Sequence, residues 1–211
     1  MHKAKVNLLL LLALALAAPV LPAQELEPNE LLQSTTLEVI AAIKRERDLH
    51  GGKPKQVAVL VETKVLPLFD FGRMTQIAVA RNWRLATPEQ RLALTAEFKT
   101  LLVRTYSAAL SSYRDQVIEF RSLRLLPADT EVTVRSVVKQ SGTAPIAMDY
   151  DMEKTPAGWK VFDIKVEGIS LVTTYRDTFA EIIRDGGVNG LVKALEDKNR
   201  QGEARSAAPK T

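Results

Sequence analysis

Hydrophobic residues recur at intervals of three and four along the first half of the chain. That spacing places apolar side chains on one face of a helix. It predicts helices over residues 28–50, 54–66, 71–80 and 88–113. The last of these has an apolar stripe wider than one buried face requires.

Local start and stop signals bound these helices. Asp70 is a good N-cap for the helix that begins at Phe71. Thr87, Pro88 and Gln90 form a capping sequence, with a hydroxyl at the N-cap, proline at the first helical position and an amide at the third. Pro67 interrupts the helix before Asp70.

The period changes from helical to alternating in the second half, which predicts four strands with turn signals between them. The first covers residues 117–126. On the next two, Val132, Val134, Ser136 and Val138 share one face, as do Ile146, Met148, Tyr150 and Met152. On the fourth, Lys160, Phe162, Ile164 and Val166 alternate with Trp159, Val161, Asp163 and Lys165. This spacing favours an antiparallel meander with one face covered.

Helical spacing returns after Gly168, from Ser170 or Thr173 to the Gly186–Gly187 pair, and again from Val188 to about Lys198. We therefore expect an α+β fold: a twisted antiparallel sheet of about four strands wrapped by N- and C-terminal helices. Residues 24–200 form a single domain, and the polar tail 201–211 is expected to be disordered.

Residues 1–23 have the pattern of a secretory signal peptide. Basic residues precede an apolar run from Leu8 to Ala18, which is long enough for a signal core and short for a membrane span. Cleavage after Ala23 or after Ala17 fits the small-residue rule. Without cysteine the chain has no lipoprotein anchor and no disulfide. We expect a soluble protein exported to the periplasm.

Charge and residue inventory exclude several classes of function. The net charge of +4 falls to +2 when Lys3 and Lys5 leave with the signal, so nucleic-acid binding is not indicated. His50 stands alone in a charged helix end, and no nucleotide-binding, hydrolase or metalloprotease motif occurs. We expect no cofactor, no metal and no enzymatic activity. One alternative stays open, in which Asp149 and Asp151, on one strand face, form an acid/base pair.

The abundant apolar side chains fit either a packed core or an apolar cavity. The wide stripe of the long helix favours a cavity, as does the presence of Met148, because methionine suits an adaptable wall.

Several segments resemble the MlaC (toluene-tolerance, Ttg2-type) family over about residues 30–200. Phe69-Asp70-Phe71 with Met74, Ile77-Ala78, Trp83, Pro88-Glu89-Gln90-Arg91 and Phe98 are similar to its helical half. The stretch from Val166-Glu167-Gly168-Ile169-Ser170-Leu171-Val172 to Tyr175-Arg176 and Phe179 resembles its strand-to-helix signature. Gly187, Gly190, Leu191, Val192 and Leu195 match its closing element.

The resemblance implies a periplasmic carrier that moves phospholipid between the inner and outer membranes and maintains outer-membrane lipid asymmetry. Its expected partners are phospholipid, an inner-membrane ABC transporter complex and the outer-membrane lipoprotein MlaA with a porin; the carrier itself is expected to be a monomer. It further implies acyl chains held between sheet and helices. The residues expected to line that cavity are Phe71, Met74, Phe98, Leu102, Tyr106, Met148, Tyr150, Ile164, Val166, Val172 and Tyr175.

Three points are left open by the sequence. Arg176 either faces a headgroup phosphate or has a structural role, which we favour. An NTF2-like enzyme using Asp149 or Asp151 would also place a pocket between sheet and helices. A periplasmic chaperone would use the apolar surface to bind unfolded clients.

Overall fold

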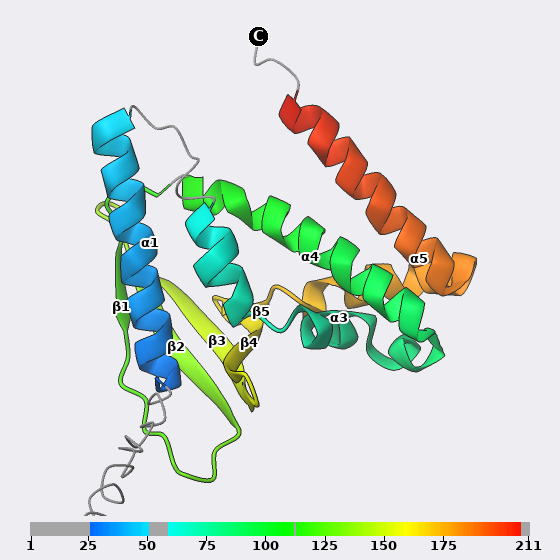
Figure 1. The fold of residues 1–211 in the computed structure, drawn as a ribbon, viewed down its shortest axis with the longest axis horizontal. Helices are drawn as coiled ribbons and strands as arrows, with labels where there is room; N and C mark the ends of the chain where they lie inside the picture. Colours follow the sequence, from blue (N-terminus) through cyan, green and yellow to red (C-terminus); the bar gives the residue numbers. More distant parts are fainter. Residues whose placement is uncertain (1–25, 51–58, 112, 208–211) are drawn as a thin grey trace, which may run out of the picture.

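The computed structural model describes residues 26–50, 59–111 and 113–207, and its elements follow the expected order (Figure 1). The helical elements are α1 (Pro28–His50), η1 (Val61–Val65), η2 (Leu66–Leu68), α3 (Phe71–Val79), η3 (Ala80–Leu85), α4 (Pro88–Ser111), η4 (Thr173–Tyr175) and α5 (Arg176–Ala207). The strands are β1 (Val117–Phe120), β2 (Glu131–Lys139), β3 (Ile146–Thr155), β4 (Gly158–Val166) and β5 (Ile169–Ser170). The α+β fold class is confirmed. The predicted signal peptide lies outside the described residues.

The described part of the predicted helix 54–66 is short and irregular. After residues 59 and 60 the chain forms one π-helical segment, η1, and then the tight turn η2, which contains Pro67. Among the helices within the described ranges, none is both long and apolar enough to cross a bilayer.

The capping signals form the contacts that the sequence predicts. Asp70 Oδ1 accepts a hydrogen bond from the backbone N–H of Arg73 at 2.8 Å, which fixes the start of α3. The N–H of Thr87 donates to Gln90 Oε1 at 2.9 Å, and the N–H of Gln90 donates to Thr87 Oγ1 at 3.3 Å. These reciprocal bonds satisfy two backbone donors at the start of α4.

The sheet is an antiparallel meander of five strands in the order β1-β2-β3-β4-β5. The fifth strand, which the sequence analysis did not predict, follows a two-residue turn in which Glu167 and Gly168 both have positive φ. Such a turn joins antiparallel strands whose twist is right-handed. The predicted first strand is shorter than expected, because pairing ends at Phe120 instead of Leu126.

A bulge changes the expected alternation along β4. Asp151 pairs with Asp163 but Met152 pairs with Val161, so Phe162 is an extra residue on that strand. The uninterrupted alternation predicted for residues 159–166 is therefore wrong. Because a bulge shifts the pattern by one residue, Val161 faces the same way as Ile164 instead of the opposite way.

The buried residues form two hydrophobic clusters. The sheet cluster joins α1 to one face of the sheet and contains Leu32, Val134, Met152, Trp159 and Val161. We call that face the inner face; α1 lies across it in Figure 1. The helical cluster is built by α3, α4 and α5. Phe69 packs against both clusters, next to its bridge with Val161.

The last helix extends beyond the expected end. The predicted break is present, since Gly187 in α5 has φ 65° and ψ −172°, but the helix continues to Ala207. The expectation of a disordered tail from Gln201 is therefore wrong up to Ala207, and residues 208–211 lie outside the described ranges. Just before this segment, Asn199 donates to Glu97 and Arg104 donates to the Asn199 carbonyl at 2.6 Å, which joins α5 to α4.

Candidate functional site

One row of side chains crosses the whole inner face of the sheet. Successive Cα partners on the five strands are Phe120, Ser136, Met148, Val166 and Ile169. Paired residues point to the same face, so the inner face continues as one surface from β1 to β5. We call these five residues the apolar strip, although Ser136 is a polar member.

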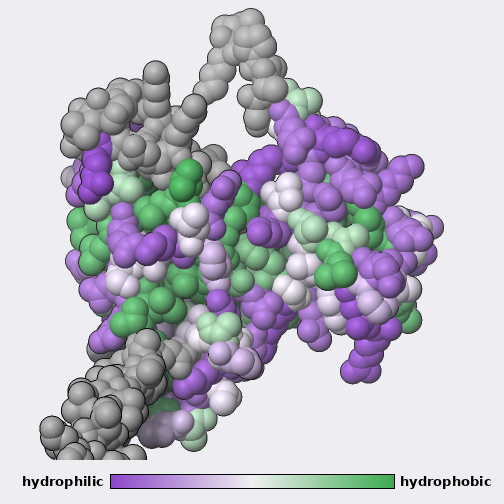
Figure 2. Space-filling view, viewed as in Figure 1, coloured by the Kyte–Doolittle hydropathy of each residue, from purple (hydrophilic) through white to green (hydrophobic). Residues whose placement is uncertain are grey.

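The apolar strip leads from a buried position to solvent. Ser136 is 1% exposed, Met148 and Val166 are half-buried, and Ile169 is 62% exposed. Ile146, two residues before Met148 on β3, is 43% exposed. Ile146 and Ile169 thus extend the buried inner face of the sheet out to solvent. Figure 2 shows hydrophobic surface gathered over α1 and between α1 and α4.

Aromatic side chains concentrate in the helical cluster. The ring of Phe98 meets Tyr175 edge-on at 5.0 Å and Phe179 at 5.2 Å between centroids. Burial and the adjacent Tyr175 raise the pKa of the Tyr106 hydroxyl. Both tyrosines therefore present aromatic bodies to the cluster while their hydroxyls interact with each other.

The eleven residues predicted to line a cavity divide between the two clusters. Seven lie in the helical cluster, whereas Tyr150 and Ile164 pack against the sheet cluster. Met148 and Val166 lie half-buried on the apolar strip. Those in the helical cluster are Phe71, Met74, Phe98, Leu102, Tyr106, Val172 and Tyr175. Their role in lining a lipid cavity stays a prediction.

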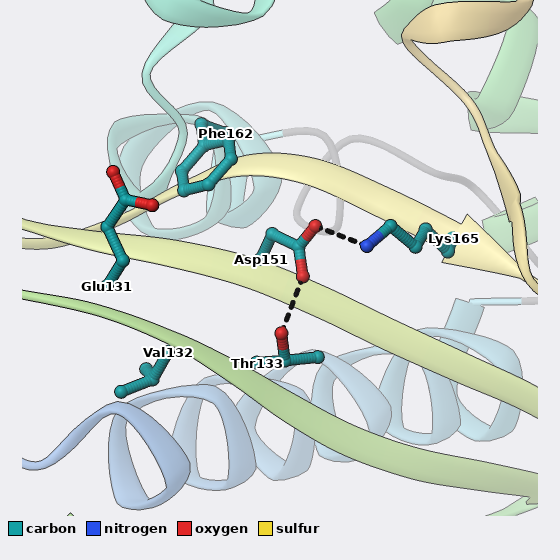
Figure 3. Close-up of a pocket in the computed structure, with 6 residues that line it drawn as sticks. All are labelled: Glu131, Val132, Thr133, Asp151, Phe162 and Lys165. Carbon is teal, nitrogen blue, oxygen red and sulfur yellow. Dashed lines mark hydrogen bonds and ion pairs between the residues drawn. The ribbon is translucent and has the colours of Figure 1, made fainter.

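Two pockets of the described structure lie elsewhere. A pocket of about 220 Å³ is formed by the start of α1 and the β3–β4 turn, between Leu31, Leu68 and Trp159. A second, of about 310 Å³, lies on the outer face of the sheet (Figure 3). None of the eleven predicted residues lines either pocket.

The outer pocket contains Asp151, one of the two candidate catalytic carboxylates. Asp151 Oδ1 accepts from the Thr133 hydroxyl at 2.8 Å, and Oδ2 contacts Lys165 Nζ at 2.6 Å (Figure 3). The hydrogen bond to Asp151 raises the pKa of Lys165. Asp149 lies in register between Arg135 and Lys165. The carboxylates of this strand therefore lie beside basic residues of the neighbouring strands. No cluster of metal ligands occurs within the described ranges.

Arg73 connects α3 to the outer face of the sheet. Its guanidinium donates to Glu131 at 2.6 Å and to Glu153, and it lies 4.0 Å from the centre of the Phe162 ring. The bulge in β4 allows the Phe162 ring to face this way. Sequence analysis missed this contact because its members are distant along the chain.

Arg176 has a related structural role, since its Nε donates to the Ile77 carbonyl at 2.9 Å and joins α5 to α3.

Asp163 is a carboxylate buried where β4 meets β5. Only 5% of the residue is exposed, and Oδ1 has no hydrogen-bond partner among the described residues. Burial raises the pKa of Asp163, and hydrogen bonds from Ser170 and the backbone of Val172 oppose that rise. Folding therefore favours the protonated form of Asp163. The free energy of unfolding should fall as the pH rises from the pKa of Asp163 in the unfolded chain through its higher pKa in the folded protein.

Asp163→Asn should therefore be more stable than the unmodified protein at pH 7, because it removes a buried charge. The advantage should shrink as the pH falls below the ordinary aspartate range, where both proteins are neutral at this position. Urea unfolding at several pH values measures it, with Asp185→Asn at an exposed site as the control. A variant equally destabilised at every pH would show that hydrogen bonds of the carboxylate dominate.

The fold and the apolar strip together define a class of protein: an α+β domain in which α1 packs on the apolar face of an antiparallel meander and α3, α4 and α5 form a second hydrophobic cluster. The sequence model of the MlaC protein family matches residues 33–197, and the chain belongs to that family. The recognition made from the motifs around Phe69 and Val166 is thereby confirmed.

Individual relatives agree with this assignment. The toluene tolerance protein ttg2D of Pseudomonas putida is 28% identical over 88% of this chain and 86% of its own. The intermembrane phospholipid transport system binding protein MlaC of Haemophilus influenzae is 21% identical, with 84% of each covered. Among solved structures, the phospholipid-binding protein from Ralstonia solanacearum, in complex with a phospholipid, has a TM-score of 0.74 and 42% identity. That match covers 84% of this chain and 99% of the other.

Proposed function

We propose that this protein is a carrier that binds phospholipid and moves it between membranes. The observation that best supports this proposal is the apolar strip on the inner face of the sheet. It runs without a charged residue from Phe120 through Met148 and Val166 to the exposed Ile169. A structural relative with 42% identity was solved with a phospholipid, which supports the same ligand class here.

The energetics of lipid transfer explain why an apolar surface is sufficient. A diacyl lipid exposes about 30 methylenes, each worth about 0.8 kcal/mol, so crossing water unaided costs on the order of 20–25 kcal/mol. A carrier that offers an environment as apolar as the bilayer reduces this difference to near zero. It needs no nucleotide, cofactor or catalytic residue, and the direction of transport comes from its partners.

The proposal includes a place and partners. A basic start followed by the apolar run 8–18 supports export to the periplasm. There the protein would exchange lipid with an inner-membrane ABC transporter complex and with the outer-membrane lipoprotein MlaA and its porin. The net effect would be to maintain outer-membrane lipid asymmetry. Family membership and the words "intermembrane phospholipid transport system" in the name of the Haemophilus influenzae relative support this part.

Protein purified from cells without added lipid should carry phospholipid into an organic extract, which mass spectrometry identifies. Val166→Glu should lose this lipid, because it places a charge on the apolar strip at a half-buried position. Leu126→Glu, at a 50% exposed loop position, is the matched control and should retain it. An extract of the unmodified protein that contains no phospholipid contradicts the proposal, and bound peptide in its place would favour a chaperone.

A further inference from the structure

Ser136 is an anomaly on the inner face of the sheet. Its strand neighbours on that face are Val134 and Val138, and its cross-strand partners are Phe120 and Met148. The residue is 1% exposed, and Oγ has no hydrogen-bond partner among the described residues. A buried hydroxyl without a partner lowers the free energy of unfolding by about 1–3 kcal/mol. Alanine or valine at this position would carry no such desolvation penalty.

A second hydroxyl lies beside it. Tyr150 projects from the neighbouring strand on the same face, one residue pair along from Ser136, and its ring stacks on Phe120 at 6.2 Å. Its hydroxyl lies 3.9 Å from Met148 Sδ, and a thioether is a weak acceptor. Burial raises the pKa of Tyr150 and an interaction with the Ser136 hydroxyl opposes that rise, so the Tyr150 hydroxyl stays protonated and lies close to that of Ser136.

The position of the two hydroxyls indicates what they would bind. They lie at the inner end of the apolar strip, whose other end, Ile169, is open to solvent. Two donors require an acceptor, which a hydrocarbon chain lacks. Among the described residues, the strand neighbours and cross-strand partners of Ser136 on this face carry no charge, so a neutral carbonyl oxygen fits better than a charged phosphate.

We propose that the hydroxyls of Ser136 and Tyr150 form a polar anchor that donates hydrogen bonds to an ester carbonyl of the bound glycerophospholipid. This inference rests on the proposed function and adds to it how the lipid is oriented. The ester region lies over β2 and β3, and the acyl chains continue along the apolar faces beyond it. The anchor favours ester-linked diacyl lipids over ether-linked lipids, which have no carbonyl at that position.

The test compares a diacyl and a dialkyl phospholipid with the same headgroup and chain length, bound to the delipidated full chain. The unmodified protein should bind the ester lipid about 2- to 12-fold more tightly, as expected for one net hydrogen bond. Ser136→Ala should lose most of this preference, and Tyr150→Phe should reduce it. Thr133→Val removes a hydroxyl from the same strand but from the outer face, and should keep the full preference.

Thermal unfolding of the lipid-free proteins separates an anchor from a structural role. Ser136→Ala should be as stable as the unmodified protein or more stable, because it removes an unsatisfied buried hydroxyl. The inference is overturned if the unmodified protein binds both lipids equally, if Ser136→Ala keeps the preference, or if it weakens both lipids alike and lowers stability. Failure of the unmodified protein to bind either lipid would instead reject the proposed function itself, and the anchor with it.

Discussion

Phe98→Ala should lower the free energy of unfolding of the lipid-free protein by about 3–5 kcal/mol, the usual range for a fully buried aromatic residue. Phe98 is 0% exposed at the centre of the helical cluster and makes edge-on contacts with both Tyr175 and Phe179. Its loss removes those contacts and leaves a cavity between α4 and α5. For a domain of this size the melting temperature should fall by roughly 10 °C.

Leu92→Ala on the same helix is the matched control. Leu92 is 74% exposed, so its truncation should change the free energy of unfolding by less than about 0.5 kcal/mol. Urea unfolding of both variants with and without bound lipid then distinguishes two roles for Phe98. A loss below about 1 kcal/mol in the lipid-free protein would contradict its assignment to a packed core and favour a position on a lipid cavity.

Local sequence signals predicted the helical half well, because the interactions that they describe join near neighbours. The Asp70 cap and the reciprocal Thr87–Gln90 bonds both span three residues. The meander order was likewise predictable, since each strand pairs with the next after a short connection. Family motifs then supplied the ligand class, which periodicity alone could not distinguish from an ordinary core.

The features that sequence analysis missed depend on contacts between distant residues. The bulge at Phe162 depends on the pairing register of β4 with β3, and no residue type on β4 indicates it in the sequence. β5 was missed because Gly168 was interpreted as the end of the sheet, although Glu167-Gly168 is a two-residue turn. The tail beyond Gln201 appeared too polar to fold, but Asn199 and Arg104 hold this end of α5 against α4.

The same limit applies to the site. Alternation identified Ser136 as a residue of the inner face, but only the structure shows that its hydroxyl is buried without a partner. The eleven predicted lining residues are apolar positions of two clusters, and pattern alone gives no means to separate those that contact lipid from those that contact one another. A polar residue that breaks an apolar row therefore identifies the site more sharply than the apolar residues around it.

Arg73→Ala should destabilise the protein by about 2 kcal/mol, the sum expected for a half-buried charged hydrogen bond and a contact with an aromatic face. Arg73 joins α3 to β2 through Glu131, to β3 through Glu153 and to β4 through Phe162. The Glu153 side chain is only 17% exposed, so the loss of its partner leaves a carboxylate that water solvates poorly. The Glu131 side chain is 57% exposed and contributes little.

Two further variants make the prediction specific to this geometry. Arg73→Lys keeps the charge but recovers only part of the loss, because an ammonium lacks the planar fork that reaches two carboxylates while stacking on a ring. Arg184→Ala breaks an ion pair with Asp185 in which the side chains are 71% and 72% exposed, and it should have almost no effect. Equal unfolding midpoints for Arg73→Ala and Arg184→Ala would show that the contact adds no stability. A large difference would show that the contact of Arg73 with the outer face of the sheet stabilises the fold in addition to the Phe69–Val161 bridge.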